Sequence, residues 1–260
     1  METNKVFEIK DVSFAYDEKP ILRHLSFDIK QGKVTTIMGA NGCGKSTLFQ
    51  LMTKNLKPEE GGIYLKNHNI EELSLKAFAK QAAIVHQYNT APSDLTVQKL
   101  VEYGRTPYMK MGHSYDPDLD SKMVERALKI TGTYAFKDRS VSELSGGQKQ
   151  RVWIAMALAQ DTDIIFLDEP TTYLDVRYQL QLLKLVKGLN EKYNTTIIMV
   201  LHDINQALAY SDEIVALDPH GSLVAQGQPK DVISQETLKK MYKIDLEITD
   251  VGGKPFVIAV

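Results

Sequence analysis

The sequence is poor in the residues that form covalent cross-links and soft-metal sites. Cys43 is the only cysteine among 260 residues, so no internal disulfide can form and a reducing compartment is expected. The six histidines show no metal-ligand spacing with one another or with Cys43. We therefore expect neither a disulfide framework nor a resident zinc or iron centre.

Long apolar runs are lacking too. Uncharged apolar stretches such as TTIIMVL at 195–201 fall well short of the roughly 18–20 residues that cross a bilayer. The first residues, METNKVFEIK, contain no apolar core of a secretory signal. We expect a chain without a membrane span of its own, which would need another chain in order to act at a membrane.

Neither sign of charge is in large excess. The chain has 31 Lys and Arg against 33 Asp and Glu, a net charge of −2, and no basic run longer than two residues. This balance argues against the basic stripe of a nucleic-acid-binding protein, so no nucleic-acid partner is expected. Internal repeats and low-complexity segments are absent as well, and the length is ample for a real core.

Apolar spacing predicts an α/β fold. Strand patterns lie at 5–30, 33–38, 61–67, 82–87, 163–170 and 195–203, with a hairpin at 213–227 that turns at 219–221. Helical patterns lie at 45–54, 95–104, 118–132, 147–159 and 175–193. We expect a parallel sheet of βα units with antiparallel strands at its start, a helical insertion in its middle, and a short helix and hairpin at 235–260.

Three apolar faces follow from the same spacing. One strand should present Leu25, Phe27 and Ile29 on a single face. Two helices should bury the faces formed by Val97, Leu100, Val101 and Gly104 and by Leu180, Leu183, Val186 and Leu189.

A phosphate-binding loop is the strongest motif. GANGCGKS at 39–46 fits G-x-x-x-x-G-K-[ST] and lies between a predicted strand and a predicted helix. Glycines allow the backbone N–H groups to turn toward phosphates, and the helix start adds its positive dipole end. Lys45 should reach the β- and γ-phosphate oxygens, and the Ser46 hydroxyl should bind Mg²⁺. The alternative is a glycine-rich turn with a chance Lys-Ser.

Two adjacent acids end a buried strand pattern in IIFLDEP. Asp168 can hold Mg²⁺ directly or through water, and Glu169 can orient or deprotonate an attacking water. The alternative is a polar strand end without a catalytic role, which the preceding phosphate loop disfavours.

Cys43 lies inside the phosphate loop, near a helix start. One interpretation is a thiol of lowered pKa that alkylating reagents can reach. The other, which we favour for the natural function, is a small residue that fills space.

A second glycine-rich helix start follows at Leu144–Gln148, LSGGQ. Ser145 and Gln148 form a capping-box pattern, and capping alone is the simple interpretation. Two adjacent glycines suggest in addition that another surface approaches closely. From Gly146 to Ala159 a helix would rise about 21 Å, so this helix start could lie far from its own Lys45 and serve a neighbouring molecule.

These motifs resemble those of the ATP-binding subunits of ABC transporters over essentially the whole chain. LSGGQ is similar to the signature of that family, and the phosphate loop, Gln87, IIFLDE, TYLD at 172–175 and His202 follow in the family's order. The resemblance implies a P-loop NTPase (RecA-like) core with an antiparallel β subdomain over 1–87 and 161–234. Residues 88–160 would form the helical subdomain, and 235–260 a short C-terminal extension.

The resemblance also implies roles for individual residues. ATP and Mg²⁺ would be bound by the phosphate loop and its helix start, through Gly39, Asn41, Gly42, Cys43, Gly44, Lys45, Ser46 and Thr47. Tyr16 would stack on the adenine, the alternative being an aromatic that packs at a strand end. The metal ligands would be Ser46, Gln87 and Asp168, and the catalytic residues Glu169, His202, Gln87 and Lys45. A satisfied structural role is the alternative for His202.

A dimer is the further implication. Two copies would face each other, with Ser145, Gly147 and Gln148 of one copy contacting the nucleotide of the other and Asp175 making a contact across the dimer. Gln87 would move with an integral membrane permease, and an extracytoplasmic substrate-binding protein would act indirectly. This places the chain at the cytoplasmic face of the cell membrane, attached through the permease.

A finer resemblance concerns the cargo. GANGCGKSTL, VEYGRTPYMKMG, LDEPTTYLD and VLHDINQALAYSD are similar to segments of importers for ferric siderophores and related iron chelates, with haem and vitamin B12 importers as the alternative. Ala40 stands where the family usually has proline, which removes no ligand. The lack of a large C-terminal domain agrees with this group. Less favoured alternatives are a non-transport ABC ATPase that acts on ribosomes or DNA, a P-loop kinase or transferase, and a non-hydrolysing adaptor.

Overall fold

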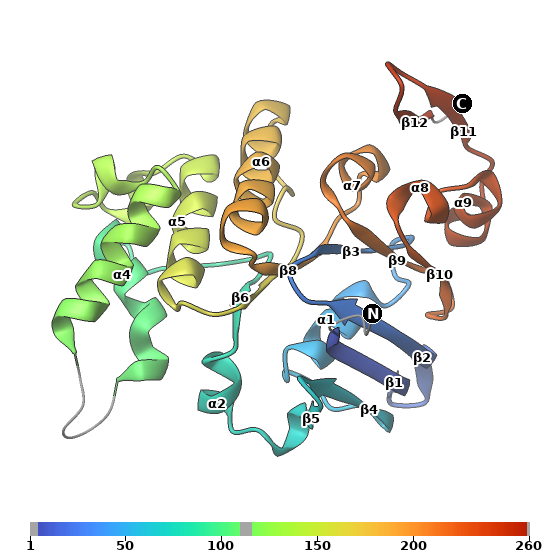
Figure 1. Cartoon of the computed structure of the whole chain (residues 1–260), viewed down its shortest axis with the longest axis horizontal. Helices are drawn as coiled ribbons and strands as arrows, with labels where there is room; N and C mark the ends of the chain where they lie inside the picture. The colour runs from blue at the N-terminus through green and yellow to red at the C-terminus, as the bar shows by residue number, and fades with distance from the viewer. Residues whose placement is uncertain (1–4, 110–115, 259–260) are drawn as a thin grey trace. The chain divides into compact units, whose positions relative to one another are not determined.

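The computed structural model describes residues 5–109 and 116–258 (Figure 1). Contacts divide the chain into two compact units, Met1–Leu73 with Asn190–Val260 and Ser74–Leu189. The segment 110–115, which includes part of the VEYGRTPYMKMG resemblance, lies outside the described residues. The predicted helical segment 88–160 falls wholly within the second unit. Its boundaries remain a prediction.

The first unit begins with an antiparallel sheet in the order β2-β1-β4-β5. Its strands are β1 (Lys5–Tyr16), β2 (Lys19–Lys30), β4 (Glu60–Leu65) and β5 (His68–Asn69). The alternation in β2 works as predicted, because Leu25, Phe27 and Ile29 are all buried.

The first unit also contains a group of mainly parallel strands. β3 (Val34–Met38) pairs in parallel with β8 (Thr196–Val200) and with β9 (Glu213–Leu217), and β10 (Leu223–Gly227) pairs antiparallel with β9. All residues of β3, β8 and β9 are buried, as expected for strands covered on both faces. The carboxylate of Asp218 accepts hydrogen bonds from the N–H groups of His220 and Ser222 in the β9–β10 turn, which confirms the turn predicted at 219–221.

The helices of the first unit are short. They are α1 (Lys45–Met52), η1 (Ile70–Glu72), α7 (Ile204–Tyr210), α8 (Pro229–Val232) and α9 (Gln235–Tyr242). The predicted C-terminal hairpin is present as β11 (Glu247–Asp250) and β12 (Pro255–Ile258). The side-chain amide of Asn205 in α7 exchanges two hydrogen bonds with the backbone of Val257, at 2.8 and 3.0 Å, and so ties this hairpin to the helix after His202.

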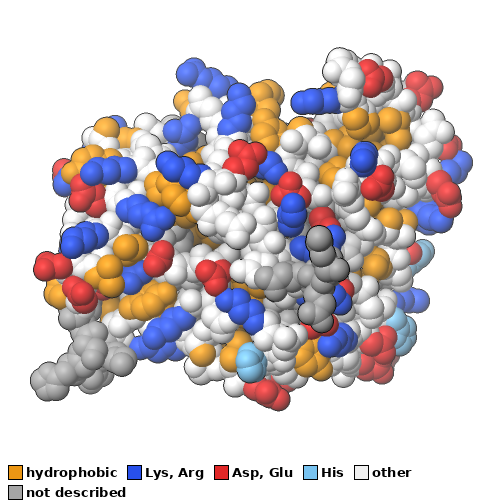
Figure 2. Space-filling model, viewed as in Figure 1, with side chains coloured by type: hydrophobic (Ala, Val, Ile, Leu, Met, Phe, Trp, Pro, Cys, Tyr) orange, Lys and Arg blue, Asp and Glu red, His pale blue; other side chains and the backbone are white. Residues whose placement is uncertain are grey.

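The second unit pairs two parallel strands, β6 (Ala82–Val85) and β7 (Ile164–Leu167), with a group of helices. The helices are α2 (Leu75–Ala79), α3 (Val97–Glu102), η2 (Tyr103–Tyr108), α4 (Pro117–Ile130), η3 (Tyr134–Phe136), η4 (Val141–Glu143), α5 (Gly146–Ala159) and α6 (Val176–Tyr193), whose last turn belongs to the first unit. In Figure 1, α4 and α5 lie side by side, in agreement with their contacts. Figure 2 shows Lys and Arg interspersed with Asp and Glu over the viewed face.

One predicted helix face is partly wrong. Leu183, Val186 and Leu189 of α6 are buried, but Leu180 is 40% exposed and Leu182 is buried instead. At about 100° per residue, Leu180 lies roughly 120° away from Val186 around the helix, whereas Leu182 lies within about 40° of it. The buried stripe is therefore centred on Val186 and excludes Leu180.

The predicted α3 face is confirmed, and Gly104 has a steric role in it. Val97, Leu100 and Val101 are buried. A Cβ atom on Gly104 would lie 2.2 Å from the carbonyl oxygen of Met156 in α5. The chain after α3 can approach the α5 backbone this closely only because residue 104 has no side chain.

We expect Gly104→Ala to lower the free energy of unfolding by about 1–3 kcal/mol, because the backbone of α5 must move to admit the methyl group. Gly188→Ala is the matched control, since a Cβ atom there meets nothing within 4 Å. It should raise the free energy of unfolding by about 0.5–1 kcal/mol through helix propensity in α6. Urea denaturation followed by circular dichroism measures both, and equal effects of the two substitutions would contradict the steric explanation.

Candidate nucleotide-binding site

The loop between β3 and α1 leaves a helix start open to an anion. Gly42 and Gly44 have φ angles of 80° and 99°, and Gly44 is the N-cap of α1 in the left-handed conformation. No side chain of the described residues caps this helix. Its first N–H groups therefore lack the usual side-chain acceptor, and a phosphate fits that donor set.

Lys45 lies across this loop. Its side chain is only 4% exposed, and its amine donates to the carbonyl oxygens of Gly39 at 2.9 Å and Ala40 at 3.0 Å. A positive charge held by neutral carbonyl groups at an open helix start is suited to binding an anion. Thr47 is buried and Ser46 is exposed, which leaves the Ser46 hydroxyl accessible to a ligand.

Cys43 fills space beneath the loop. It is 1% exposed, and a Cβ atom on Gly39 would lie 2.6 Å from its sulfur. Burial raises the pKa of the Cys43 thiol, although the charge of Lys45 opposes this change. The interpretation of Cys43 as an activated thiol of lowered pKa is therefore wrong, and the space-filling interpretation agrees with the structure.

Tyr16 and His202 occupy strand ends of the first unit. Tyr16 ends β1, is 45% exposed, and meets Phe14 edge to face with ring centroids 4.9 Å apart. The contact with Phe14 is the strand-end packing of the alternative interpretation, and the exposure leaves the ring accessible. His202 is exposed and follows β8 by two residues, next to Asp203, the N-cap of α7. The stacking role of Tyr16 and the phosphate contact of His202 remain predictions.

Gln87 and Glu169 meet in the second unit. The parallel strands β6 and β7 end together, and the N–H of Asp168 donates to the carbonyl of Val85 at 2.9 Å. Just beyond these strand ends, Nε2 of Gln87 donates to Oε2 of Glu169 at 2.6 Å, and the Thr172 hydroxyl donates to the same oxygen at 3.2 Å. The structure thus orients the predicted base with two donors, of which Thr172 was not predicted.

The backbone at Glu169 is unusual. Its φ angle is 46°, in the left-handed region that residues with a Cβ atom rarely adopt. Such conformations persist where surrounding contacts hold them, and they are concentrated at functional sites. The two hydrogen bonds to its carboxylate are contacts of this kind.

The second glycine-rich helix start is capped as predicted. Ser145 is the N-cap of α5, its Oγ accepts from the N–H of Gln148 at 3.4 Å, and Oε1 of Gln148 accepts from the N–H of Ser145 at 3.0 Å. Ser145 and Gly146 are exposed. Gly147 is buried, and a Cβ atom there would lie 2.8 Å from the ring of Tyr178 in α6. The surface that approaches Gly147 thus belongs to the same unit, and the exposed part of the motif is Ser145–Gly146.

Asp175 also caps a helix. Its Oδ1 accepts from the N–H of Tyr178 at 3.1 Å, at the first turn of α6, while the residue stays exposed. Capping accounts for an aspartate here without a partner chain, so the predicted contact across a dimer remains a prediction.

The family follows from the match to known proteins. Residues 22–172 match the model of the family described as ABC transporter, and this segment contains the phosphate loop, Glu169 and the capped LSGGQ helix start. The chain belongs to the ABC transporter family. As an ABC ATPase with a P-loop NTPase fold, it binds and hydrolyses ATP.

Relatives of this ABC ATPase match over nearly its full length. The petrobactin import ATP-binding protein FpuD of Bacillus anthracis is 44% identical over 256 residues, which cover 98% of this chain and 93% of the relative. The iron(3+)-hydroxamate import ATP-binding protein FhuC of Bacillus subtilis (strain 168) is 42% identical over 239 residues, covering 92% and 88%.

Solved structures agree with the fold. A transporter described as of the metal-chelate type, in an inward-facing conformation, superposes with a TM-score of 0.83 at 25% identity, covering 98% of this chain and 96% of that chain. The ABC transporter cassette MJ0796, solved as a dimer, superposes with a TM-score of 0.73 at 30% identity, covering 86% and 98%. Among the described residues of the ABC ATPase, no helix is both long and apolar enough to cross a bilayer.

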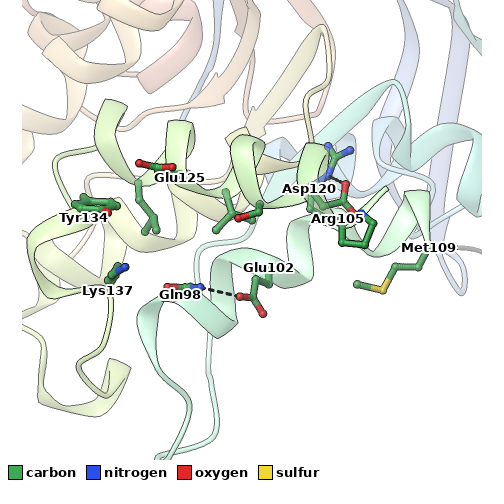
Figure 3. Close-up of a pocket in the computed structure, with 12 residues that line it drawn as sticks. Gln98, Glu102, Arg105, Met109, Asp120, Glu125, Tyr134 and Lys137 are labelled. Atoms are coloured by element: carbon green, nitrogen blue, oxygen red, sulfur yellow. Dashed lines mark hydrogen bonds and ion pairs between the residues drawn. The ribbon is translucent and has the colours of Figure 1, made fainter. Parts of the chain in front are cut away.

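A separate pocket lies within the helical part of the ATPase (Figure 3). It has a volume of about 260 Å³ and is lined by α3, η2, α4 and the segment near η3, with none of the predicted nucleotide ligands among its residues. A buried ion pair joins Arg105 Nε to Asp120 Oδ1 at 2.7 Å, and Arg105 Nη1 donates to the carbonyl of Ala159 at 2.8 Å. The ion pair ties η2 to α4, the second bond ties η2 to α5, and the pocket lies among these helices.

Proposed function

We propose that this chain is the ATP-hydrolysing subunit of an importer for iron–siderophore complexes or related ferric chelates. The near-full-length similarity to import proteins for petrobactin and ferric hydroxamates carries this proposal. The residues themselves support only the ATPase part, because no group of three or more His, Cys, Asp or Glu among the described residues could hold a metal ion.

In this proposal the first unit binds the phosphates of ATP. The open start of α1 donates its N–H groups, Lys45 neutralises negative charge, and Gly39, Asn41, Gly42 and Gly44 shape the loop. Ser46, Gln87 and Asp168 are oxygen donors, which is the ligand chemistry that Mg²⁺ prefers. When bound, Mg²⁺ would stabilise the charge that develops on the phosphate oxygens.

The chemical step is the attack of water on the γ-phosphorus. The oxygen of the water forms a bond to phosphorus while Glu169 accepts a proton from that water. The bond between phosphorus and the bridging oxygen of ADP breaks. Gln87 and Thr172 orient the carboxylate for this task. His202 would contact the γ-phosphate from the first unit.

We further propose that two copies enclose each nucleotide. The start of α5, which already satisfies its own cap, would donate through Ser145 and Gly147 to the γ-phosphate held by the other copy, with Gln148 and Asp175 supporting that interface. The γ-phosphate then bridges two bodies, so that its hydrolysis separates them. Integral membrane permease subunits would receive this motion, at the cytoplasmic face of the membrane, and an extracytoplasmic substrate-binding protein would deliver the cargo.

Uptake by cells tests the cargo. We expect cells that carry this chain and its permease to accumulate radioactive iron supplied as ferric petrobactin or a ferric hydroxamate, and expect the uptake to stop when the chain is deleted or carries Glu169→Gln. Exposed Glu191→Gln is the matched control and should restore uptake. Uptake of haem or vitamin B12 in place of the ferric chelates would contradict the proposed cargo and leave the ATPase role standing.

A further inference from the structure

Two exposed tyrosines form a contact directly beside the predicted base. Tyr88 follows Gln87 in the chain, and Tyr173 follows Thr172. Their hydroxyl oxygens are 2.8 Å apart and their ring centroids are 6.1 Å apart. Both side chains are largely exposed, Tyr88 at 69% and Tyr173 at 78%. The contact therefore does not result from burial in a core.

The hydrogen bond between Tyr88 and Tyr173 lies next to the one between Gln87 and Glu169. Gln87 reaches Oε2 of Glu169, and Tyr88 reaches Tyr173, so neighbouring residues of one segment bind the two ends of the turn that follows β7. The Thr172 hydroxyl closes that turn by donating to the same carboxylate oxygen. Two hydrogen bonds thus join the segments 87–88 and 169–173, and a third closes the 169–173 turn on itself.

The turn itself needs such support. Glu169 and Tyr173 both have positive φ angles, 46° and 64°, although neither is glycine. Left-handed conformations at two positions within five residues are costly and persist where surrounding contacts hold them. The hydrogen bond to Tyr173 also raises the pKa of Tyr88 above its usual value.

We propose that Tyr88 and Tyr173 are positioning residues, whose hydroxyl–hydroxyl bond fastens segment 87–88 to the 169–173 turn and thereby keeps Gln87 on the carboxylate of Glu169. This tyrosine clasp acts on the base and not on the nucleotide. The inference rests on the proposed role of Glu169 in ATP hydrolysis. The proposal gives the two tyrosines a role in ATP turnover. Helix capping, core packing or burial does not explain their contact.

Phenylalanine substitutions test the clasp because they remove only the hydroxyl groups. We expect Tyr88→Phe and Tyr173→Phe each to lower kcat for ATP hydrolysis by about two- to fivefold and to leave KM for ATP unchanged, since a single net hydrogen bond is lost. The double variant should lose no more than either single variant, because one bond is removed in all three. Tyr103→Phe is the matched control, at an exposed tyrosine of η2 away from Glu169, and should keep wild-type kcat.

Hydrogen exchange gives a readout that does not depend on turnover. Tyr88→Phe should speed amide exchange in the peptide that spans 168–175, and Tyr173→Phe should do the same in the peptide that spans 85–90, each by about two- to fivefold. An effect on the opposite segment is what a clasp requires, and a purely local disturbance would not produce it.

The outcomes separate the two proposals. Multiplying losses in the double variant, an equal rise in KM, a rise in kcat, or exchange that stays unchanged in the opposite segment would each overturn the clasp. If wild type and Glu169→Gln hydrolyse ATP equally, the role of Glu169 fails, and the exchange measurement then decides alone whether the tyrosines join the two segments.

Discussion

Replacing Glu169 with glutamine is expected to reduce ATP turnover by about 10²–10⁴-fold, the range over which general-base catalysis contributes. Glutamine preserves the length and planarity of the side chain, and its carbonyl oxygen can still accept from Gln87 and Thr172, as Oε2 of Glu169 does. It cannot accept the proton of the attacking water at neutral pH. The substitution should therefore remove the chemical step and leave the fold and the nucleotide affinity in place.

Three measurements check this expectation. Phosphate release gives turnover, calorimetric titration gives the affinity for ATP, and light scattering gives the mass with and without ATP. Because hydrolysis no longer separates the copies, the variant should remain dimeric with ATP. Turnover within twofold of wild type would show that Glu169 is not the base, and a monomeric variant with bound ATP would count against the dimer. Glu191→Gln, at an exposed position of α6, should behave as wild type.

The parts of the site that the sequence predicts well are set by residues close together in the chain. The phosphate loop needs positive φ angles at Gly42 and Gly44 directly before a helix, and the glycine spacing encodes both. The capping box needs a serine and a glutamine three residues apart, and the structure forms both of its hydrogen bonds. Strand alternation in β2 is equally local. In each case the residues that determine the geometry are the residues that form the pattern.

Contacts between distant segments could not be predicted in this way. The sequence identifies Gln87 and Glu169 as separate candidates, but their hydrogen bond depends on the pairing of β6 with β7. The sequence marks neither Arg105 nor Asp120 as a candidate site, and only the packing of η2 against α4 makes them a buried pair. Periodicity alone gives no sign of either contact, because two segments must first be brought together.

Gly147 and Leu180 show that the sequence also does not predict which surfaces pack together. The glycine pair at 146–147 indicates a close approach, yet the approaching ring at Gly147 is Tyr178 of the same unit. Leu180 matches a three-residue spacing with Leu183, but the core side of α6 is set by the segments packed against it. A sequence pattern can show that a surface must be close without showing which surface it is.

Mixing two inactive variants is expected to restore activity if each site is built from two copies. Lys45→Ala removes the amine that binds the phosphates, and Ser145→Arg places a bulky charged side chain at the exposed start of α5. Each variant alone should keep less than about 1% of wild-type turnover, because both sites of its dimer carry the lesion. A mixed dimer has one site with both lesions and one site with none.

The recovery has a definite size. Random pairing makes about half of the dimers mixed, and each mixed dimer has one intact site of two, so about a quarter of wild-type turnover should return at equal concentrations. Ser145→Ala is the matched control, since it removes the cap hydroxyl without adding bulk and costs the helix about 1 kcal/mol. It should retain far more turnover than Ser145→Arg. Full turnover of Ser145→Arg as a demonstrated monomer would refute a shared site, because a lone copy would then complete its own site. Mixed dimers that regain no turnover would refute it too, because a copy would then gain nothing from its partner.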